Sequence, residues 1–237
     1  MAALIAHLLT AYAVIGMPWL GYLWYQKAKA RILAGFPDAR VGLYRAIVAE
    51  QILTTAGVLA FWRLAQLNPA ALGLSAPRSW RGTLAVAAVI VAFLTWSGFR
   101  LRRVSATLRQ RVQESVGALL PASHRERRWF AVVSVGAGIS EELLFRGFLL
   151  YYLAIYVPRF NTPERVLLAG LSFGFAHLYQ GKRGIVGTSI LGVLLAAFYL
   201  LSGSLFLPVA VHIANDLRVL WIFPPPSPES SAAAVEV

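Results

Sequence analysis

Residues 83–99 read TLAVAAVIVAFLTWSGF, an apolar run without a charged side chain, and Arg100 follows directly. A membrane-spanning helix needs about 20 mostly apolar residues, so a run of this kind predicts a transmembrane helix. Similar runs recur along the 237-residue chain, which is 58% hydrophobic and only 14% charged. An ordinary soluble domain carries about 25% charged residues. The sequence therefore predicts an all-α, polytopic transmembrane bundle of about seven to eight spans.

The apolar runs divide the chain into spans and loops. The expected spans are Ala3 to Tyr25, Leu43 to Leu67, Thr83 to Phe99, Trp129 to Tyr156, Val166 to Leu178, Ile185 to Leu201 and Leu205 to Phe223. Spans five and six are short and contain Gly, so the count could change by one. Residues 1–127 hold the first three spans and most of the basic loops, and residues 128–223 hold the later spans. Residues 224–237 are rich in Pro, Ser and Ala, which predicts a disordered tail.

Positive charge is concentrated between the spans. The formal net charge is +12, from 22 Lys and Arg against 10 Asp and Glu. The basic residues lie mainly between spans one and two, three and four, and five and six, which predicts that these loops are cytoplasmic and the N-terminus is outside. The basic stretch Lys27 to Arg40 is expected on the membrane surface, and the middle of the basic stretch Arg100 to Arg128, Val104 to Leu120, is expected to form an amphipathic surface helix. No basic motif of a nucleic-acid-binding module is present, so we expect no nucleic-acid partner.

The first span and the absence of cysteine carry two further expectations. No basic region precedes the first apolar run, and its positive charges follow it, which predicts a retained span and not a cleaved leader. With no cysteine in the chain, disulfides and thiolate chemistry are excluded.

Span four contains charges that helix packing does not require. Residues 136–147 read GAGISEELLFRG, with Glu141, Glu142 and Arg146 near mid-span. Each charge at a span centre costs about 2.5–3.5 kcal/mol on insertion scales. Glu142 and Arg146 are four residues apart on one helical face, so they can pair. Glu141 points about 100° away from that face. Its partners are therefore expected on other helices.

Histidines on two later spans are the expected partners. His177 ends span five, one helical turn after Phe173, and His212 in span seven is one turn before Asp216. Such a set could activate water, with Glu141 taking a proton, or it could bind a metal through histidines and a carboxylate. The chain has no His-Glu-x-x-His helix, which weakens the metal interpretation but leaves a divalent metal possible. A serine mechanism has less support, because the nearby serines have no nucleophile-elbow context.

Three motifs, in this order on three late spans, resemble the CAAX-protease and bacteriocin-processing family, which includes the type II prenyl-protein endopeptidase. They are Glu141-Glu142-x-x-x-Arg146, Phe173-x-x-x-His177 and His212-x-x-x-Asp216. The resemblance covers about residues 128–223 and implies an intramembrane glutamate protease without a cofactor. It implies that Glu141 and His177 activate water, and that His212 and Asp216 form the oxyanion hole.

The resemblance also implies that Glu142 and Arg146 hold the first motif in shape. The family takes Asn or Asp at the position of Asp216, and a carboxylate donates to an oxyanion only when protonated. Neighbouring Asn215 could share that role, although it points about 100° away. Elsewhere, Glu50 in span two either lines the same cavity or has a structural partner.

The expected substrate is a membrane-embedded or lipid-linked peptide or protein. The Ala-rich, Arg-over-Lys composition indicates a bacterial source and hence the inner membrane. Two other functions stay open: a non-proteolytic immunity or scaffold protein, and a proton-coupled transporter that uses its buried Glu and His as a relay. Clear inverted-repeat symmetry, typical of many transporters, is missing.

Overall fold

The computed structural model describes residues 1–103 and 116–223. This described part is almost entirely helical and contains no β-strand. Its elements are α1 (Ala2–Ala11), η1 (Tyr12–Gly16), α2 (Met17–Leu33), α3 (Ala39–Leu64), η2 (Pro69–Leu72), α4 (Trp80–Arg102), η3 (Gly117–Leu119), α6 (His124–Glu142), η4 (Leu143–Leu149), α7 (Leu150–Tyr156), α8 (Thr162–Ala176), η5 (Leu178–Gln180), α9 (Gly181–Ser202) and α10 (Phe206–Ile222). The expected tail, residues 224–237, and most of the expected surface helix, residues 104–120, lie outside the described residues.

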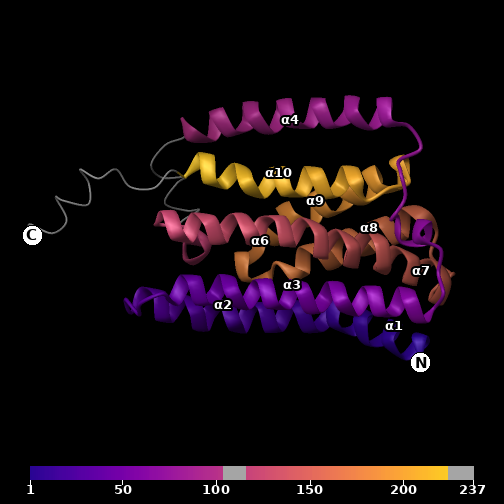
Figure 1. The fold of residues 1–237 in the computed structure, drawn as a ribbon, viewed down its shortest axis with the longest axis horizontal. Coiled ribbons are helices and arrows are strands. Elements are labelled where there is room, and N and C mark those ends of the chain that lie inside the picture. Colours follow the sequence, from indigo (N-terminus) through magenta and orange to yellow (C-terminus); the bar gives the residue numbers. More distant parts are fainter. Residues whose placement is uncertain (104–115, 224–237) are drawn as a thin grey trace, which may run out of the picture.

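The helices run side by side along the long axis of the molecule (Figure 1). Helix α10 packs against both α4 and α6, α6 packs against α3, and α8 packs against α9. Four helices in the described part are long and apolar enough to cross a membrane: Ala2–Leu33, Ala39–Leu64, Trp80–Arg102 and Leu178–Ser202. The all-α membrane bundle is therefore confirmed.

The other expected spans are helical too, but they are shorter or more polar. Helix α8 has 15 residues and α10 has 17. At 1.5 Å per residue they are about 22–26 Å long, less than the ~30 Å hydrocarbon core. Span four is a continuous rod formed by α6, η4 and α7, and its charges lower its mean hydropathy. The count of seven to eight spans stays a prediction.

The first long helix, formed by α1, η1 and α2, extends further than the sequence predicts. Elements α1, η1 and α2 form one helix from Ala2 to Leu33, so the first residues of the expected surface stretch continue the span. Helix-favouring Ala, Lys, Gln and Arg residues follow Trp24 without a Gly or Pro to stop the helix. Gly35, at φ 75°, follows its end. Segment η1 is a π-helix that ends two residues before Pro18, which lacks the N–H of a regular helical turn.

The start of α6 is fixed by a capping box that also bonds to α3. The Ser123 hydroxyl accepts a hydrogen bond from the Glu126 backbone N–H, and the Glu126 carboxylate accepts one from the Ser123 N–H. Arg40, near the start of α3, donates to both carboxylate oxygens of Glu126 at 3.1 Å. Further along, the Gln51 amide on α3 donates to the Val133 carbonyl on α6 at 3.0 Å. These contacts set the position of α3 relative to α6.

Helix α4 shows how the outer surface is adapted to lipid. It packs against α10, and between its ends it exposes many large apolar side chains: Leu84, Val86, Val89, Val91, Phe93, Trp96 and Phe99. In water such a surface would be unfavourable, whereas lipid tails contact it without cost. The exposed apolar residues are therefore consistent with a helix at the edge of a membrane bundle.

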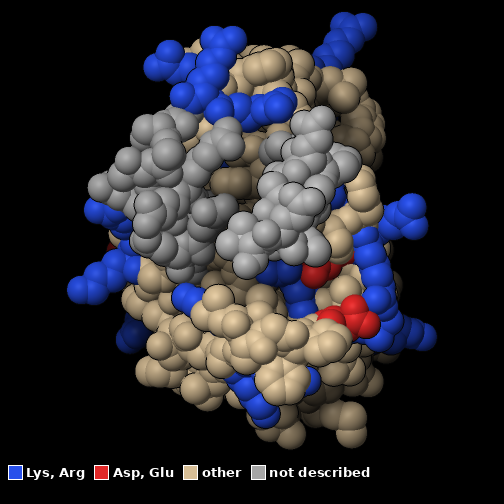
Figure 2. Space-filling view, turned by 90° about the vertical axis from the view of Figure 1, so that its left-hand side faces the viewer, with Lys and Arg blue, Asp and Glu red and all other residues tan. Residues whose placement is uncertain are grey.

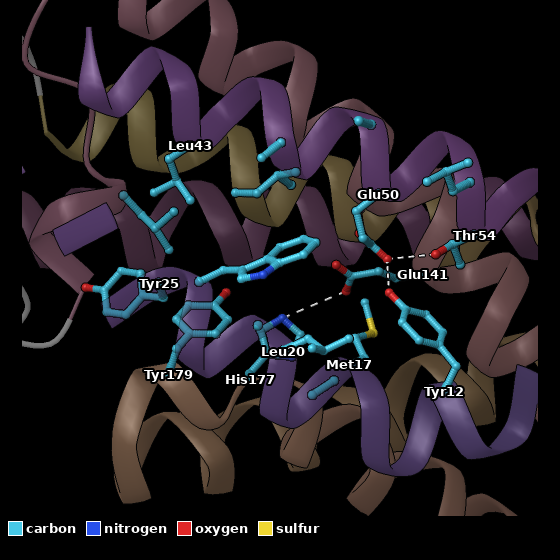
Figure 3. Close-up of a pocket in the computed structure, with 18 of the residues that line it drawn as sticks. Tyr12, Met17, Leu20, Tyr25, Leu43, Glu50, Thr54, Glu141, His177 and Tyr179 are labelled. Atoms are coloured by element: carbon cyan, nitrogen blue, oxygen red, sulfur yellow. Dashed lines mark hydrogen bonds and ion pairs between the residues drawn. The ribbon is translucent and has the colours of Figure 1, made fainter. Parts of the chain in front are cut away.

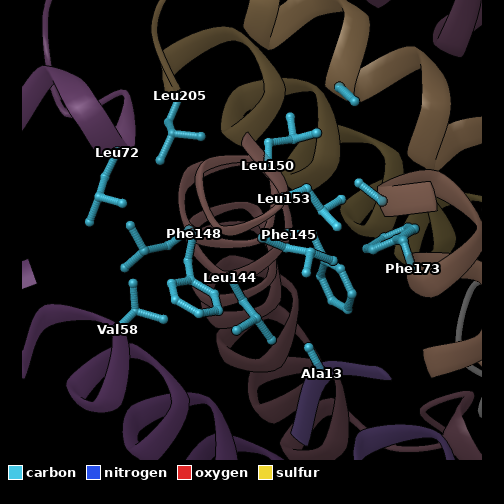
Figure 4. Packing of buried hydrophobic residues seen from close by; sticks show 14 of the residues in the cluster. Ala13, Val58, Leu72, Leu144, Phe145, Phe148, Leu150, Leu153, Phe173 and Leu205 are labelled. Carbon is cyan, nitrogen blue, oxygen red and sulfur yellow. The ribbon is translucent and has the colours of Figure 1, made fainter. Parts of the chain in front are cut away.

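The buried core surrounds the π-helix η4. Leu144, Phe145 and Phe148 point from it into neighbouring helices, where they meet residues such as Val58 and Phe173 (Figure 4). Every residue of η4 is buried, including Arg146. The segment that follows the two glutamates is therefore held by packing on all sides.

Close packing of α8 on α9 depends on glycines. The pattern Gly170-x-x-x-Gly174 predicts such an approach. A Cβ at Gly170 would lie within 3.2 Å of the Val193 backbone, and one at Gly174 would meet Ser189 and Ile185 of α9. The predicted helix contact is confirmed, and it sets the position of His177 at the end of α8.

Candidate active site

The structure brings the three motifs together from three helices. Glu141 lies in the last turn of α6, His177 caps the C-terminus of α8, and His212 lies in α10. Glu141 Oε2 is 3.8 Å from His177 Nε2 and 4.0 Å from His212 Nε2. Glu141 thus lies next to histidines of two other helices, as its position on the helix predicts.

The second glutamate has a different environment. Glu142 is fully buried and Arg146 is 1% exposed, and Arg146 Nη1 donates to Glu142 Oε1 at 2.8 Å. This is the i, i+4 pair that the sequence predicts. Arg146 Nη2 also donates to the Gly192 carbonyl of α9 at 3.1 Å. The pair therefore links the first motif to a neighbouring helix.

Glu142 has a further contact that the sequence does not reveal. Its Oε1 also accepts a hydrogen bond from His212 Nδ1 at 2.7 Å. A carboxylate hydrogen-bonded to one ring nitrogen fixes the orientation of an imidazole. Glu142 therefore orients His212 as well as pairing with Arg146. Spacing within a helix could predict Arg146 as a partner, whereas contact with His212 depends on the rotation of α10.

The hydrogen bond of His177 determines which of its nitrogens faces Glu141. His177 Nδ1 lies 2.8 Å from the Phe173 carbonyl, which can only accept, so Nδ1 carries the proton. In the neutral imidazole Nε2 is then an acceptor. Glu141 Oε2 is buried and accepts no hydrogen bond from any described residue. Two acceptors thus face each other across 3.8 Å, a spacing that suits a bridging molecule with two donors, such as water.

Phe173 lies at the centre of the motif residues. The Arg146 guanidinium lies 4.3 Å from its ring centroid, in a cation–π contact. The rings of His177 and His212 are 4.8 Å and 5.7 Å from the same ring. Phe173 therefore packs against both histidines and the arginine.

The last motif position is less closely attached. Asp216 Oδ2 is 3.7 Å from His212 Nε2, and Asp216 Oδ1 accepts a hydrogen bond from the Asn215 amide at 3.2 Å. His212 Nε2 therefore lies near two carboxylates, those of Glu141 and Asp216. The Asn215 amide donates to Asp216, and within the described part of the chain it forms no hydrogen bond with Glu141, His177 or His212.

A large, mostly apolar cavity opens beside Glu141 and His177. It has a volume of about 600 Å³. Its walls come mainly from the first long helix (α1, η1 and α2) and from α3, and they include Met17, Leu20, Trp24, Leu43, Ile47 and Leu53. Figure 3 shows the Glu141 carboxyl group and the His177 ring directed into it. His212 and Asp216 do not line this cavity.

Sequence reasoning missed most of the cavity wall. Tyr12, Thr54 and Tyr179 line it. Glu50 also lines the cavity and has structural partners, so both alternatives that the sequence left open for this residue hold. The Tyr12 hydroxyl donates to Glu50 Oε1, and the Thr54 hydroxyl donates to the same oxygen at 2.7 Å. The available signal was a Glu and a Thr four residues apart in an apolar span.

Within residues 1–103 and 116–223, no group of three or more His, Cys, Asp or Glu side chains is arranged to hold a metal ion.

Comparison with known protein families places the later helices of the chain. Residues 125–218 match the family described as Type II CAAX prenyl endopeptidase Rce1-like, which confirms the resemblance inferred from the three motifs. The matched segment contains all the motif residues and ends before the C-terminus of α10, but it includes none of α1, α2 or α3. No curated protein and no solved structure matches the chain.

Proposed function

Because residues 125–218 match the type II CAAX prenyl endopeptidase Rce1-like family, we propose that the chain is an intramembrane endopeptidase. In this proposal Glu141 and His177 activate the water that attacks the peptide bond. The observation that carries the proposal is the pair of acceptors, Glu141 Oε2 and His177 Nε2, facing each other across 3.8 Å at the wall of a cavity. A water there could donate one hydrogen to each.

The reaction then proceeds as an ordinary peptide hydrolysis. Glu141 accepts a proton as the water oxygen forms a bond to the carbonyl carbon. The carbon–nitrogen bond breaks, and Glu141 returns the proton to the departing amine. The oxyanion needs a donor, and His212 is the candidate because its Nε2 lies 4.0 Å from Glu141 Oε2. With a proton on each nitrogen, His212 donates to Glu142 through Nδ1 and to the oxyanion through Nε2.

The cavity supports a substrate that belongs to the membrane. Its wall is mostly apolar side chains, which suit an apolar peptide segment or a lipid-linked one. One end of the bundle is rich in Lys and Arg (Figure 2). Helices α2 and α4 end there with Arg31, Arg100 and Arg102, and α6 begins there. We propose that this end is cytoplasmic and that the N-terminus is outside, in a bacterial inner membrane.

Hydrolysis in heavy-oxygen water tests the proposal directly. The purified protein is incubated in detergent with a panel of apolar membrane peptides, with and without a chelator, and the products are analysed by mass spectrometry. We expect two fragments, with the heavy oxygen in the new carboxyl group of the N-terminal fragment. Loss of product with chelator would show that a metal takes part. No product across the panel would favour a scaffold, and proton flux into loaded vesicles would favour a transporter.

Asp216 can be tested by a substitution of the same size. Asn at this position keeps an acceptor near His212 and adds an amide donor for the oxyanion. We expect Asp216→Asn to retain kcat/KM within about tenfold, and Asp216→Leu to lose about a hundredfold, as when an oxyanion donor is removed. Steady-state kinetics on the best peptide of the panel would measure both. An inactive Asp216→Asn variant would show that the negative charge beside His212 is essential and would contradict a donor role.

A further inference from the structure

The active-site cavity contains a second carboxylate that the proposed hydrolysis does not use. Glu50 lies on α3, outside the segment that matches the Rce1-like family. Its carboxyl group and that of Glu141 enter the same end of the cavity, beside the Tyr12 hydroxyl (Figure 3). Thr54 lies at this same end beside Glu50, whereas Tyr25 and Tyr179 lie towards the opposite end (Figure 3).

The hydrogen bonds that hold the Glu50 carboxyl group come, among the described residues, from neutral hydroxyl groups. The hydroxyls of Tyr12 and Thr54 both donate to Oε1. These two come from different elements, η1 and α3, so the carboxyl group is fixed on two sides. Both bonds use Oε1. No described residue forms a hydrogen bond with the other oxygen, Oε2. One acceptor oxygen is therefore available at the cavity wall.

Among residues 1–103 and 116–223, no basic side chain pairs with the Glu50 carboxyl group. No Lys or Arg is among the residues that line the cavity, and no Lys or Arg forms an ion pair with Glu50 in the described part of the chain. Glu142, one helix away, provides the contrast, because Arg146 pairs with it at 2.8 Å. A carboxylate in an apolar cavity is costly unless it is paired. Among the described residues, Glu50 therefore has no cationic partner, whereas Glu142 has Arg146.

We propose that Glu50 binds a positively charged group of the substrate, an ammonium or guanidinium close to the scissile bond. This inference rests on the proposed peptidase function and adds a specificity to it. The cation is either a Lys or Arg side chain or a free N-terminal ammonium, since all of these present N–H donors with positive charge. Because Glu50 and Glu141 share one end of the cavity, the cation lies within a residue or two of the bond that is cut.

Matched peptides test the charge preference without depending on catalysis. Short Leu- and Ala-rich peptides carry Lys, norleucine, Arg or citrulline at one central position, so each pair differs mainly in charge. Binding is measured by tryptophan fluorescence, since Trp24 lines the cavity, to Glu141→Ala protein and to the same protein with Glu50→Gln. We expect the Lys and Arg peptides to bind at least about tenfold more tightly than their neutral partners, and Glu50→Gln to remove most of that ratio.

Two further variants separate charge recognition from folding. Glu50→Asp keeps the charge and should keep part of the preference. Glu164→Gln removes a carboxylate from the capping box at the start of α8, away from the cavity, and should leave the preference unchanged. Free and acetylated amino termini on the norleucine peptide show whether a terminal ammonium can serve as the cation.

The outcomes distinguish this inference from the peptidase proposal. Equal binding of charged and neutral peptides, or a preference that persists in Glu50→Gln, would overturn the cation site even if wild-type protein cleaves peptides. A Glu50-dependent preference in a protein that cleaves nothing would support the cation site and contradict the peptidase function. Cleavage with the same preference in kcat/KM would support both.

Discussion

Glu141→Gln should lower kcat/KM for peptide cleavage by at least about a hundredfold, because a general base contributes about 10²–10⁴ to the rate. Gln has nearly the same shape as Glu but cannot accept the proton from water. Glu141 Oε2 accepts no hydrogen bond from any described residue, so the substitution leaves no donor unpaired. The protein should therefore fold normally, and the loss should appear in kcat with KM little changed. Single-turnover kinetics on the best peptide would measure it.

A double variant tests whether Glu141 and His177 act on the same water. If they do, Glu141→Gln with His177→Gln should be about as slow as the slower single variant, since effects of groups that act as a unit do not add. Glu164→Gln serves as the control for removal of a carboxylate elsewhere, and thermal unfolding in detergent confirms folding. Equal product from wild type and Glu141→Gln would rule out Glu141 as the base.

The sequence predicts the parts of this site that depend on spacing within one helix. Glu142 and Arg146, four residues apart, form the predicted pair, and Gly170 and Gly174 make the predicted contact with α9. The separation of Glu141 from that pair follows from helical geometry as well. In each case a periodicity of 3.6 residues per turn is enough, because no other element needs to be placed.

The parts that sequence reasoning missed depend on how distant helices are rotated and placed. Tyr12 and Glu50 are 38 residues apart and meet only because the π-helix η1 faces α3. His212 and Glu142 are 70 residues apart and meet through the orientation of α10. The cavity has the same origin, since most of its wall comes from helices outside the matched motifs. Tertiary packing, which no local pattern encodes, thus decides which polar groups share the site.

The buried pair makes a second strong prediction. Arg146→Met should destabilise the protein by about 3–5 kcal/mol, because it leaves the charge of Glu142 buried without its cation. Met fills much of the space of the Arg stem, so lost packing contributes little of this. The substitution also removes the hydrogen bond to the Gly192 carbonyl and the cation–π contact with Phe173. Unfolding in mixed detergent micelles with increasing SDS would measure the change.

An exposed pair in the same protein supplies the matched control. Arg125 and Asp38 are 2.7 Å apart, but their side chains are 55% and 64% exposed. Arg125→Met should therefore cost less than about 1 kcal/mol. Adding Glu142→Gln to Arg146→Met should recover part of the lost stability, because the unpaired charge is then gone. Two outcomes would contradict the idea that a buried ion pair holds the first motif in place. One is an equal loss of stability for Arg146→Met and Arg125→Met, and the other is no recovery of stability in the double variant.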